Sequence, residues 1–495
     1  MNIPLLLRTI RHLKPTQVFY QVKNRLVKPA YIALEAPPIE IHNGLEEPIA
    51  RYTSWDGRQF SFLNLEHEYA GWNFTDNGML WAYNQNYMDW LNQSVNSEEI
   101  RDKSEGEFWI DKFIEDLPSN RIGLGPYPIA LRSINWVKFF CRYPDCATKQ
   151  RLDSLYSQLR LLEKKLEYHL LGNHLLEDAY ALYIGAAFFN DERLLKKAER
   201  LLLSQLEEQI LPDGAHYEQS PMYHCILLDR LLDCINIRKT DALVKYAIQM
   251  LGHLESIVWK DGTIPMLNDS ANGIAPLPSQ LFDYARRLGL SWMPIQLKEC
   301  GYRRMVSDNM EAIVDVRNIT ATYQPGHTHA DTFNYELRIN GMPFVVDTGI
   351  STYNKTERRQ LERSTIAHNT VSVNGGNSSE VWGGFRVGRR ATVSDVRWKM
   401  EEGRCDIEAS HNGFGKECWR KFSMNDGAFA VEDRYDGKAT SYIHLADGAD
   451  ENRIIVDGAE SIEVKPWKYS TEYNRFHDGK VLEIHFKEHV RYTIQ

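Results

Sequence analysis

The sequence lacks any apolar run of the roughly 20 residues that a helix needs to cross a membrane. The apolar run at its start, from Pro4 to Leu7, ends at Arg8 and is too short for the apolar region of a secretory signal. These absences predict a chain with no integral membrane span and a cytoplasmic location, while a periplasmic or cell-envelope location stays open.

An excess of positive charge is also lacking. Lys and Arg number 58 against 67 Asp and Glu, so the net charge is −9, and no overall basic field indicates a nucleic-acid partner. The seven cysteines show no CxxC spacing, which argues against a disulfide scaffold and against a cysteine zinc site. We therefore expect reduced, mostly buried thiols.

Acidic residues are missing from the start of the chain. Six basic residues precede the first acidic residue, Glu35; they are Arg8, Arg11, Lys14, Lys23, Arg25 and Lys28. Two interpretations fit this pattern: a helix face in water, and peripheral attachment to an anionic membrane. The sequence alone favours the solvated face, because a charged helix face usually points to water.

The spacing of apolar residues changes near residue 305 and divides the chain into two parts. Before it, apolar residues recur at helical spacing, as in Leu155, Leu159 and Leu162. Helices are predicted over roughly 79–93, 129–141, 174–189, 221–237, 241–258 and 279–288. Many helices of similar length joined by short loops are typical of a bundle, a solenoid or a toroid, and periodicity does not choose among these.

Short alternating strands follow after Glu311. Asn-Gly or Asp-Gly dipeptides, which tolerate the positive φ of tight hairpins, occur at 340–341, 374–375, 436–437, 457–458 and 478–479. This pattern predicts a β-sandwich or stacked antiparallel sheets. The predicted division is an N-terminal extension over 1–60, a helical domain over 61–305 and a β domain over 306–495.

Histidines and carboxylates gather in the β half. In an extended segment His327 and His329 would project on the same side, and Asp347 and His368 follow them. Imidazole nitrogens with one carboxylate form a standard zinc-binding set. A hydrogen-bonded polar seam between strands explains these residues equally well.

Two further polar clusters lie in the helical half. Pro221 is suited to the first position of a helix, which places Tyr217, Glu218 and Tyr223 around the start of that helix. In the other cluster, Asn173 precedes a predicted helix and is a plausible N-cap. Core packing of the tyrosines and simple capping by Asn173 would account for both clusters.

Taken together, the three clusters resemble the heparinase II/III family of polysaccharide lyases and its alginate-lyase relatives. The matching stretches lie between about residues 120 and 390, at 172–177, 211–224, 262–269, 326–331, 346–349 and 363–371. The His-Thr-His-Ala-Asp and Ala-His-Asn-Thr segments are the most specific of them. The resemblance implies a multi-domain chain, with an N-terminal (α/α) toroid followed by a C-terminal antiparallel β-sandwich and a substrate cleft at their junction.

The resemblance also implies β-elimination on a uronic-acid-containing, acidic polysaccharide. Asn173 would lie beside the uronate carboxylate, Tyr223 would be the acid/base, and His327 would be the second catalytic group. A single structural zinc would be held by His329, Asp347 and His368. Substrate binding would fall to His174, Tyr217, Glu218 and Arg386, with Tyr217 a weaker second choice for the acid/base.

The chemistry explains these residue types. Removing the proton α to a carboxylate places extra charge on the acid group, and neutral or cationic donors stabilise that charge in the transition state. A tyrosine, whose pKa is ordinarily about 10, acts as a base when cationic neighbours lower its pKa. We therefore expect a lowered pKa for Tyr223. Because no export signal is recognised, the chain resembles family members of bacterial surface-polysaccharide metabolism more than secreted heparin degraders.

Two other functions compete with a lyase. A glycoside hydrolase on the same scaffold would need two carboxyl groups about 5–9.5 Å apart across a cleft, and Asp213, Glu218 and Asp269 are available. A non-catalytic glycan-binding factor in polysaccharide synthesis would need only some of Asn173, Tyr223 and His327. The sequence contains no indication of the oligomeric state.

Overall fold

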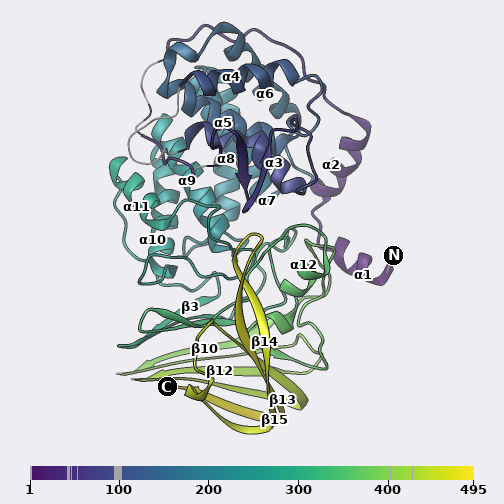
Figure 1. The fold of residues 1–495 in the computed structure, drawn as a ribbon, viewed down its shortest axis with the longest axis vertical. Coiled ribbons are helices and arrows are strands. Elements are labelled where there is room, and N and C mark those ends of the chain that lie inside the picture. The colour runs from purple at the N-terminus through teal and green to yellow at the C-terminus, as the bar shows by residue number, and fades with distance from the viewer. Residues whose placement is uncertain are drawn as a thin grey trace.

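A computed structural model describes residues 3–41, 45, 47–52, 54–93, 103–401, 403–425 and 427–495. Helices form the first half and antiparallel sheets form the second (Figure 1). This order confirms the predicted α-then-β fold class. The principal helices are α1 (Ile3–Ile10), α2 (Pro15–Leu26), α3 (Met79–Tyr87), α4 (Lys103–Asp116), α5 (Pro126–Arg142), α6 (Lys149–Lys164), α7 (Gly172–Phe188), α8 (Glu192–Gln209), α9 (Pro221–Ile237), α10 (Asp241–Ile257), α11 (Pro278–Arg287) and α12 (Glu357–Glu362).

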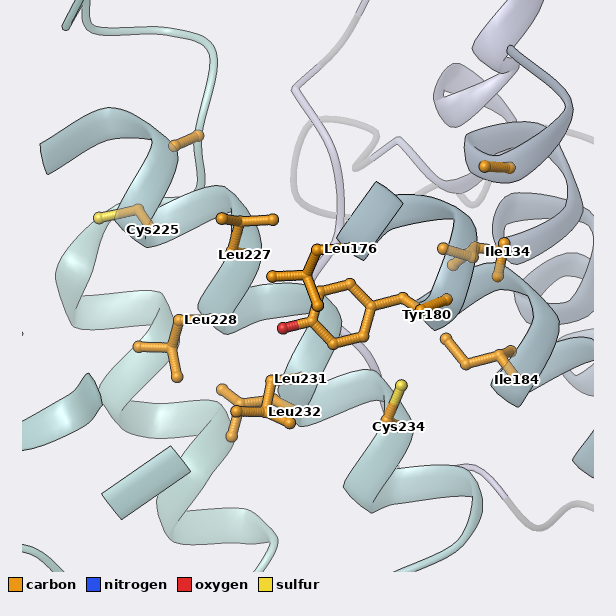
Figure 2. Packing of buried hydrophobic residues seen from close by; sticks show 14 of the residues in the cluster. Ile134, Leu176, Tyr180, Ile184, Cys225, Leu227, Leu228, Leu231, Leu232 and Cys234 are labelled. Carbon is orange, nitrogen blue, oxygen red and sulfur yellow. The ribbon is translucent and has the colours of Figure 1, made fainter. Parts of the chain in front are cut away.

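The helical half is built around α7. Both α5 and α9 pack against α7, and nearly all of its side chains are buried. Figure 2 shows Tyr180 of α7 lying against Leu227 and Leu231 of α9. Fully burying side chains of this size stabilises the fold by about 1.5–3 kcal/mol each, which explains why α7 carries apolar residues on nearly every side.

The strands of the second half are β3 (Tyr302–Val306), β4 (Met310–Asp315), β5 (Tyr335–Ile339), β6 (Met342–Val345), β7 (Val371–Ser372), β8 (Val381–Trp382), β9 (Arg386–Val387), β10 (Val393–Glu401), β11 (Arg404–His411), β12 (Cys418–Asn425), β13 (Ala428–Leu445), β14 (Ile454–Glu472) and β15 (Arg475–Ile494). Most of them join one antiparallel sheet in the order β10-β11-β12-β13-β6-β5-β4-β3. The small hairpin of β1 (Gln59–Phe62) and β2 (Leu65–Glu68) belongs to the helical half.

The long sheet folds back on itself, and its two layers share one apolar core. Tyr335 of β5 packs on Phe422 of β12 and Phe429 of β13, with ring centroids 5.8 and 5.3 Å apart. The strand β13 belongs to both layers, because one end pairs with β12 while the other pairs with β6 and β7. Two antiparallel layers enclosing a core are the arrangement of a sandwich.

The hairpin prediction was right at one of the five sites. Asn340 and Gly341 have φ of 53° and 79° and join the paired strands β5 and β6. Asn374 and Gly375 form a turn with φ of 52° and 66°, but β7 before it pairs with β13 and β8 after it pairs with β9. The Asp-Gly pairs at 436–437, 457–458 and 478–479 instead lie inside β13, β14 and β15. The first two coincide with register shifts. Gly479 is required because a Cβ there would lie 2.4 Å from the Leu445 carbonyl oxygen.

The predicted boundaries at 60/61 and 305/306 stay predictions, although β3 spans the second of them. All seven cysteines are unpaired, and six of them are buried. Within the described part of the chain, no helix combines the length and apolar character that a membrane crossing demands.

A buried ion pair joins the β core to the loop that carries His368. Arg420 donates to both carboxylate oxygens of Asp433, at 2.6 and 2.7 Å, and to the carbonyl oxygens of Phe333 and Asn369. We predict that Arg420→Leu lowers the free energy of unfolding by about 3–5 kcal/mol, because it leaves the Asp433 charge buried and unpaired. Urea unfolding measures this. Arg434→Ala, at an exposed pair with Glu432, is the control and should have a much smaller effect.

Candidate active site

The candidate site lies where the starts of α7 and α9 and the loop before α11 meet the β-half loops that carry His327 and Tyr353. At the start of α7, Gly172 has φ of 61°, and a Cβ there would lie 2.6 Å from Glu218 Oε1. Only glycine therefore allows Glu218 to approach this helix end. At the start of α9, the Ser220 side chain accepts a hydrogen bond from the Tyr223 backbone N–H at 3.2 Å, and this cap orients the first turn that carries Tyr223.

Asn173 and His327 are brought together from the two halves of the chain. The Asn173 Nδ2 atom lies 3.3 Å from His327 Nε2 and donates to Glu218 Oε1 and Oε2 at 3.1 and 3.0 Å. The Asn173 backbone N–H also donates to Glu218 Oε1, at 2.8 Å. Glu218 is 1% exposed, so in the free protein its carboxylate orients the amide of Asn173.

Asp269 holds the other side of His327. Its Oδ2 atom lies 2.9 Å from His327 Nδ1, and its Oδ1 atom lies 2.8 Å from His329 Nε2. Arg359 donates to the two oxygens of Asp269 at 2.5 and 2.7 Å. Burial opposes the charge on Asp269, but Arg359 and the two histidines outweigh it and hold the pKa of the carboxyl well below its usual range.

Tyr223 covers the face of His327. The two ring centroids are 3.9 Å apart, and the Tyr223 hydroxyl lies 3.4 Å from the hydroxyl of Tyr353. Tyr353 in turn lies 3.4 Å from His327 Nδ1. Burial raises the pKa of Tyr223, and the carboxylates of Asp269 and Glu218 act in the same direction. The expectation of a lowered pKa was therefore wrong, because the positive charge of Arg359 is already matched by Asp269.

Sequence reasoning missed Arg359 and Tyr353 and assigned Asp269 only to the hydrolase alternative. The arginine lies in α12 and the tyrosine in the loop before it, where no spacing links them to the histidine motif. The Asn268-Asp269 pair within the matched stretch 262–269 was the one available signal.

The predicted substrate-binding residues of the helical half lie in different surroundings. Tyr217 is 3% exposed, and its hydroxyl lies 2.8 Å from that of Tyr323. His174 is partly exposed, with Nδ1 3.0 Å from Glu167 Oε2. Burial disfavours a charged His174, but Glu167 and the more distant Glu218 and Glu177 outweigh it and raise its pKa. The binding roles of both residues stay predictions.

Arg386 of the β8–β9 hairpin and Arg389, which follows it, differ in how free they are to bind a ligand. Arg386 is exposed, and its guanidinium stacks over the Trp382 ring at 4.7 Å. Arg389 is engaged by backbone carbonyl oxygens, including those of Ser378 and Asn377 at 2.9 and 3.1 Å. Of these two, Arg386 is the one placed to meet a ligand from solvent, and its binding role also stays a prediction.

The residues predicted to hold a metal form a buried cluster beside Asp269. His368 Nδ1 lies 2.8 Å from Asp347 Oδ2, and the rings of His329 and His368 have centroids 5.3 Å apart. His329 Nδ1 and His368 Nε2 are buried with no hydrogen-bond partner among the described residues. Burial lowers the pKa of His329 to about 4, so its imidazole is neutral at pH 7, the form that binds a metal.

Closer sets of metal-ligating side chains occur elsewhere in the described chain. Two triads have ligand atoms within 4.8 Å of one another: a buried one of Asp213, His253 and Cys300, and a more exposed one of Glu463, Glu483 and His485. The predicted set is not among them, so a metal held by His329, Asp347 and His368 would have to draw their ligand atoms closer.

The three carboxylates considered for hydrolysis are already engaged. Asp213 Oδ2 accepts from the backbone N–H groups of Lys298 and Cys300 at 2.9 and 2.8 Å. Glu218 holds Asn173, and Asp269 holds Arg359 with the two histidines. The lowered pKa of Asp213 and of Asp269 keeps both ionised, whereas a hydrolase needs a protonated carboxyl as its general acid.

Comparison with known protein families covers most of the chain. The model described as heparinase II/III N-terminus matches residues 133–285, and the model described as heparinase II/III-like, C-terminal matches residues 291–491. The chain belongs to the heparinase II/III family. Asn173 and Tyr223 lie within the first match and His327 within the second, so the site joins the two matched regions.

Two curated relatives show the extent of the likeness. A heparin-sulfate lyase of Pedobacter heparinus is 27% identical over 263 residues, which are 46% of this chain and 39% of that protein. A heparin-sulfate lyase of Bacteroides thetaiotaomicron is 23% identical over 345 residues, 56% of this chain and 46% of that protein. The chain thus matches less than half the length of each relative.

Solved structures share the fold of this heparinase II/III family member. A crystal structure of heparinase III has a TM-score of 0.66 at 14% identity, covering 97% of this chain and 91% of that one. The heparan sulfate lyase HepC of Pedobacter heparinus has a TM-score of 0.53 at 16% identity, covering 97% and 87%. These likenesses confirm the predicted toroid and β-sandwich.

The ion pair of His174 and Glu167 makes stability depend on pH. A raised pKa means that the stabilisation is fully present below the ordinary histidine pKa of about 6.5 and is lost as pH rises through the folded value. We predict that His174→Ala costs roughly 1 kcal/mol more at pH 5.5 than at pH 9. Urea unfolding of both proteins at the two pH values measures the difference. An equal cost at both would contradict the raised pKa.

Proposed function

We propose that the protein is a polysaccharide lyase that cleaves a uronic-acid-containing glycan by β-elimination. The observation that carries the proposal is the clamped His327, held by Asp269 on one side, facing Asn173 on the other, and covered by Tyr223. The names of the curated relatives, which are heparin-sulfate lyases, support the same reaction class.

His327 is suited to take the proton α to the uronate carboxylate. The Asp269 carboxylate faces Nδ1 at 2.9 Å, which favours a hydrogen on that nitrogen and a lone pair on Nε2. Nε2 is the atom that faces Asn173. A base is thereby directed toward the place where the Asn173 amide would meet the substrate carboxylate, and such assistance typically contributes about 10²–10⁴-fold in rate.

Tyr223 is suited to donate a proton. Its raised pKa keeps the phenol neutral, so the hydroxyl can protonate the glycosidic oxygen as the C4–O bond breaks. Tyr353, 3.4 Å from the Tyr223 hydroxyl, can orient it. This division of labour replaces a tyrosinate base with a histidine base and a tyrosine acid.

Charge at the site favours an acidic but lightly sulfated glycan. Arg386 is exposed at the β8–β9 hairpin, whereas a charge on His174 is paired with the Glu167 carboxylate. Arg359 and Arg389 are bound by Asp269 and by carbonyl oxygens, so they offer little to sulfate groups. Uronate-rich surface polysaccharides of bacteria fit this balance.

The first test measures the elimination activity of the Tyr223→Phe variant. We expect a loss of about 10²–10⁴-fold in the rate at which the new C4–C5 double bond absorbs ultraviolet light, because the proton donor is removed. Uronate glycans of low and high sulfation form the substrate panel. Tyr217→Phe is the matched control and should retain most activity. A loss confined to Tyr217→Phe would move the acid to that residue, and new reducing ends without absorbance would indicate a hydrolase.

We also propose that His329, Asp347 and His368 hold one structural zinc. The support is the donor set itself and the two buried imidazole nitrogens without partners, since metal ligation would satisfy both. When bound, zinc would tie the loop that carries His327 to the strand region around Asp347. Each step of the proposed elimination is carried by the protein's own side chains.

Elemental analysis tests the zinc. We expect close to one zinc per chain in protein purified without added metal, and a loss of the metal in His368→Ala. Cys300→Ser is the matched control, because it disrupts the buried triad of Asp213, His253 and Cys300 and should retain the zinc. Metal lost only from Cys300→Ser would place the ion in that triad instead.

A further inference from the structure

The first two helices lie along one edge of the molecule, outside the packed halves (the purple elements in Figure 1). The residues before Glu35 contain six bases and no acid. The sequence alone favours a solvated helix face over a membrane-binding one. The direction in which each helix face points distinguishes the two interpretations.

Both helices turn polar side chains toward the protein. On α1, Arg8 donates to Glu380 at 2.7 Å and Thr9 Oγ1 accepts from the Trp382 indole at 3.0 Å. On α2, the amide of Gln17 is 1% exposed and donates to the carbonyl oxygens of Leu170 and Tyr323. Tyr20 of α2 also packs inward, on Tyr168 with ring centroids 4.7 Å apart. Ordinary surface helices instead bury most of their apolar side chains.

The apolar side chains of the same helices point to the outside. Ile3, Leu7 and Ile10 are exposed at spacings of four and three, which form one face of α1. On α2 the exposed apolar residues are Val18, Phe19, Val22 and Leu26, and Leu26 is 79% exposed. Soluble surfaces rarely gather so many large apolar side chains unless something covers them.

The positive charge beside the apolar side chains indicates an anionic partner for this surface. Arg11, Arg25 and Lys28 are exposed beside the apolar side chains. An anionic bilayer complements both features, since apolar groups enter the acyl boundary while bases meet lipid phosphates. A second copy placed face to face would bring like charges together. With 8 and 12 residues, the helices are too short to cross a membrane and suited to lie on one.

We infer that α1 and α2 form a docking surface for an anionic lipid bilayer. The surface adjoins the candidate active site, because α1 rests on the β8–β9 hairpin, whose Phe385 packs on Tyr353 with ring centroids 5.1 Å apart. Docking would hold the site close to glycan at the bilayer surface. The inference does not depend on which reaction the site performs.

Vesicle co-sedimentation of the full chain tests the inference. At about 100 mM salt we expect binding to vesicles of phosphatidylglycerol and phosphatidylethanolamine, and little binding to phosphatidylcholine vesicles. Phe19→Ser with Leu26→Ser should weaken binding at least tenfold by removing apolar contacts, and Arg25→Glu with Lys28→Glu should do the same by reversing charge. Both variants alter exposed positions and should keep the wild-type melting temperature.

Matched controls lie on distant exposed positions. Met293→Ser with Met400→Ser removes apolar side chains of similar exposure, and Lys468→Glu with Lys487→Glu reverses two exposed bases of the β half. Neither should change vesicle binding. Equal binding to both vesicle types, or binding to neither, would overturn the inference. A concentration-dependent dimer that Phe19→Ser with Leu26→Ser abolishes, without vesicle binding, would assign the surface to a second copy.

Discussion

The site depends on the contacts of one charged side chain, Asp269. One buried carboxylate meets Arg359 through both oxygens and reaches His327 and His329 through one oxygen each. Its negative charge favours a hydrogen on Nδ1 of His327, and it opposes the lowering effect of Arg359 on the pKa of Tyr223. Because a buried charge of this kind is tolerated only when paired, the loop geometry around it is closely restricted.

This pairing also joins the two halves of the molecule. Asp269 lies between α10 and α11 in the helical half, whereas Arg359, His327 and His329 belong to the β half. Glu218 adds a second junction, since it binds Asn173 and lies 3.4 Å from His327. The site therefore exists only when toroid and sandwich are docked. A change in their docking would alter the base, the acid and the carboxylate-binding amide together.

The N-terminal helices reverse the usual rule of burial. Their polar faces are anchored by Arg8, Thr9 and Gln17, and their apolar faces remain outside. Anchoring through polar contacts leaves the apolar faces available for a bilayer. Arg8 and Thr9 also link this surface to the β8–β9 region beside the candidate active site, so the proposed membrane surface and the proposed glycan site lie next to each other.

Local pattern alone determined much of the architecture. Helical spacing located α9 and α10 to within a residue, and Asn340-Gly341 marked a hairpin, because these signals act over a few residues. The histidine motif and its family likeness pointed to Asn173, Tyr223 and His327. Only the tertiary structure decided the partners: Arg359 and Tyr353 reach the site through the docking of distant segments, and the raised pKa of Tyr223 follows from burial. Local spacing carries no information about long-range contacts or desolvation. For the same reason it did not predict that three Asp-Gly pairs lie inside long strands.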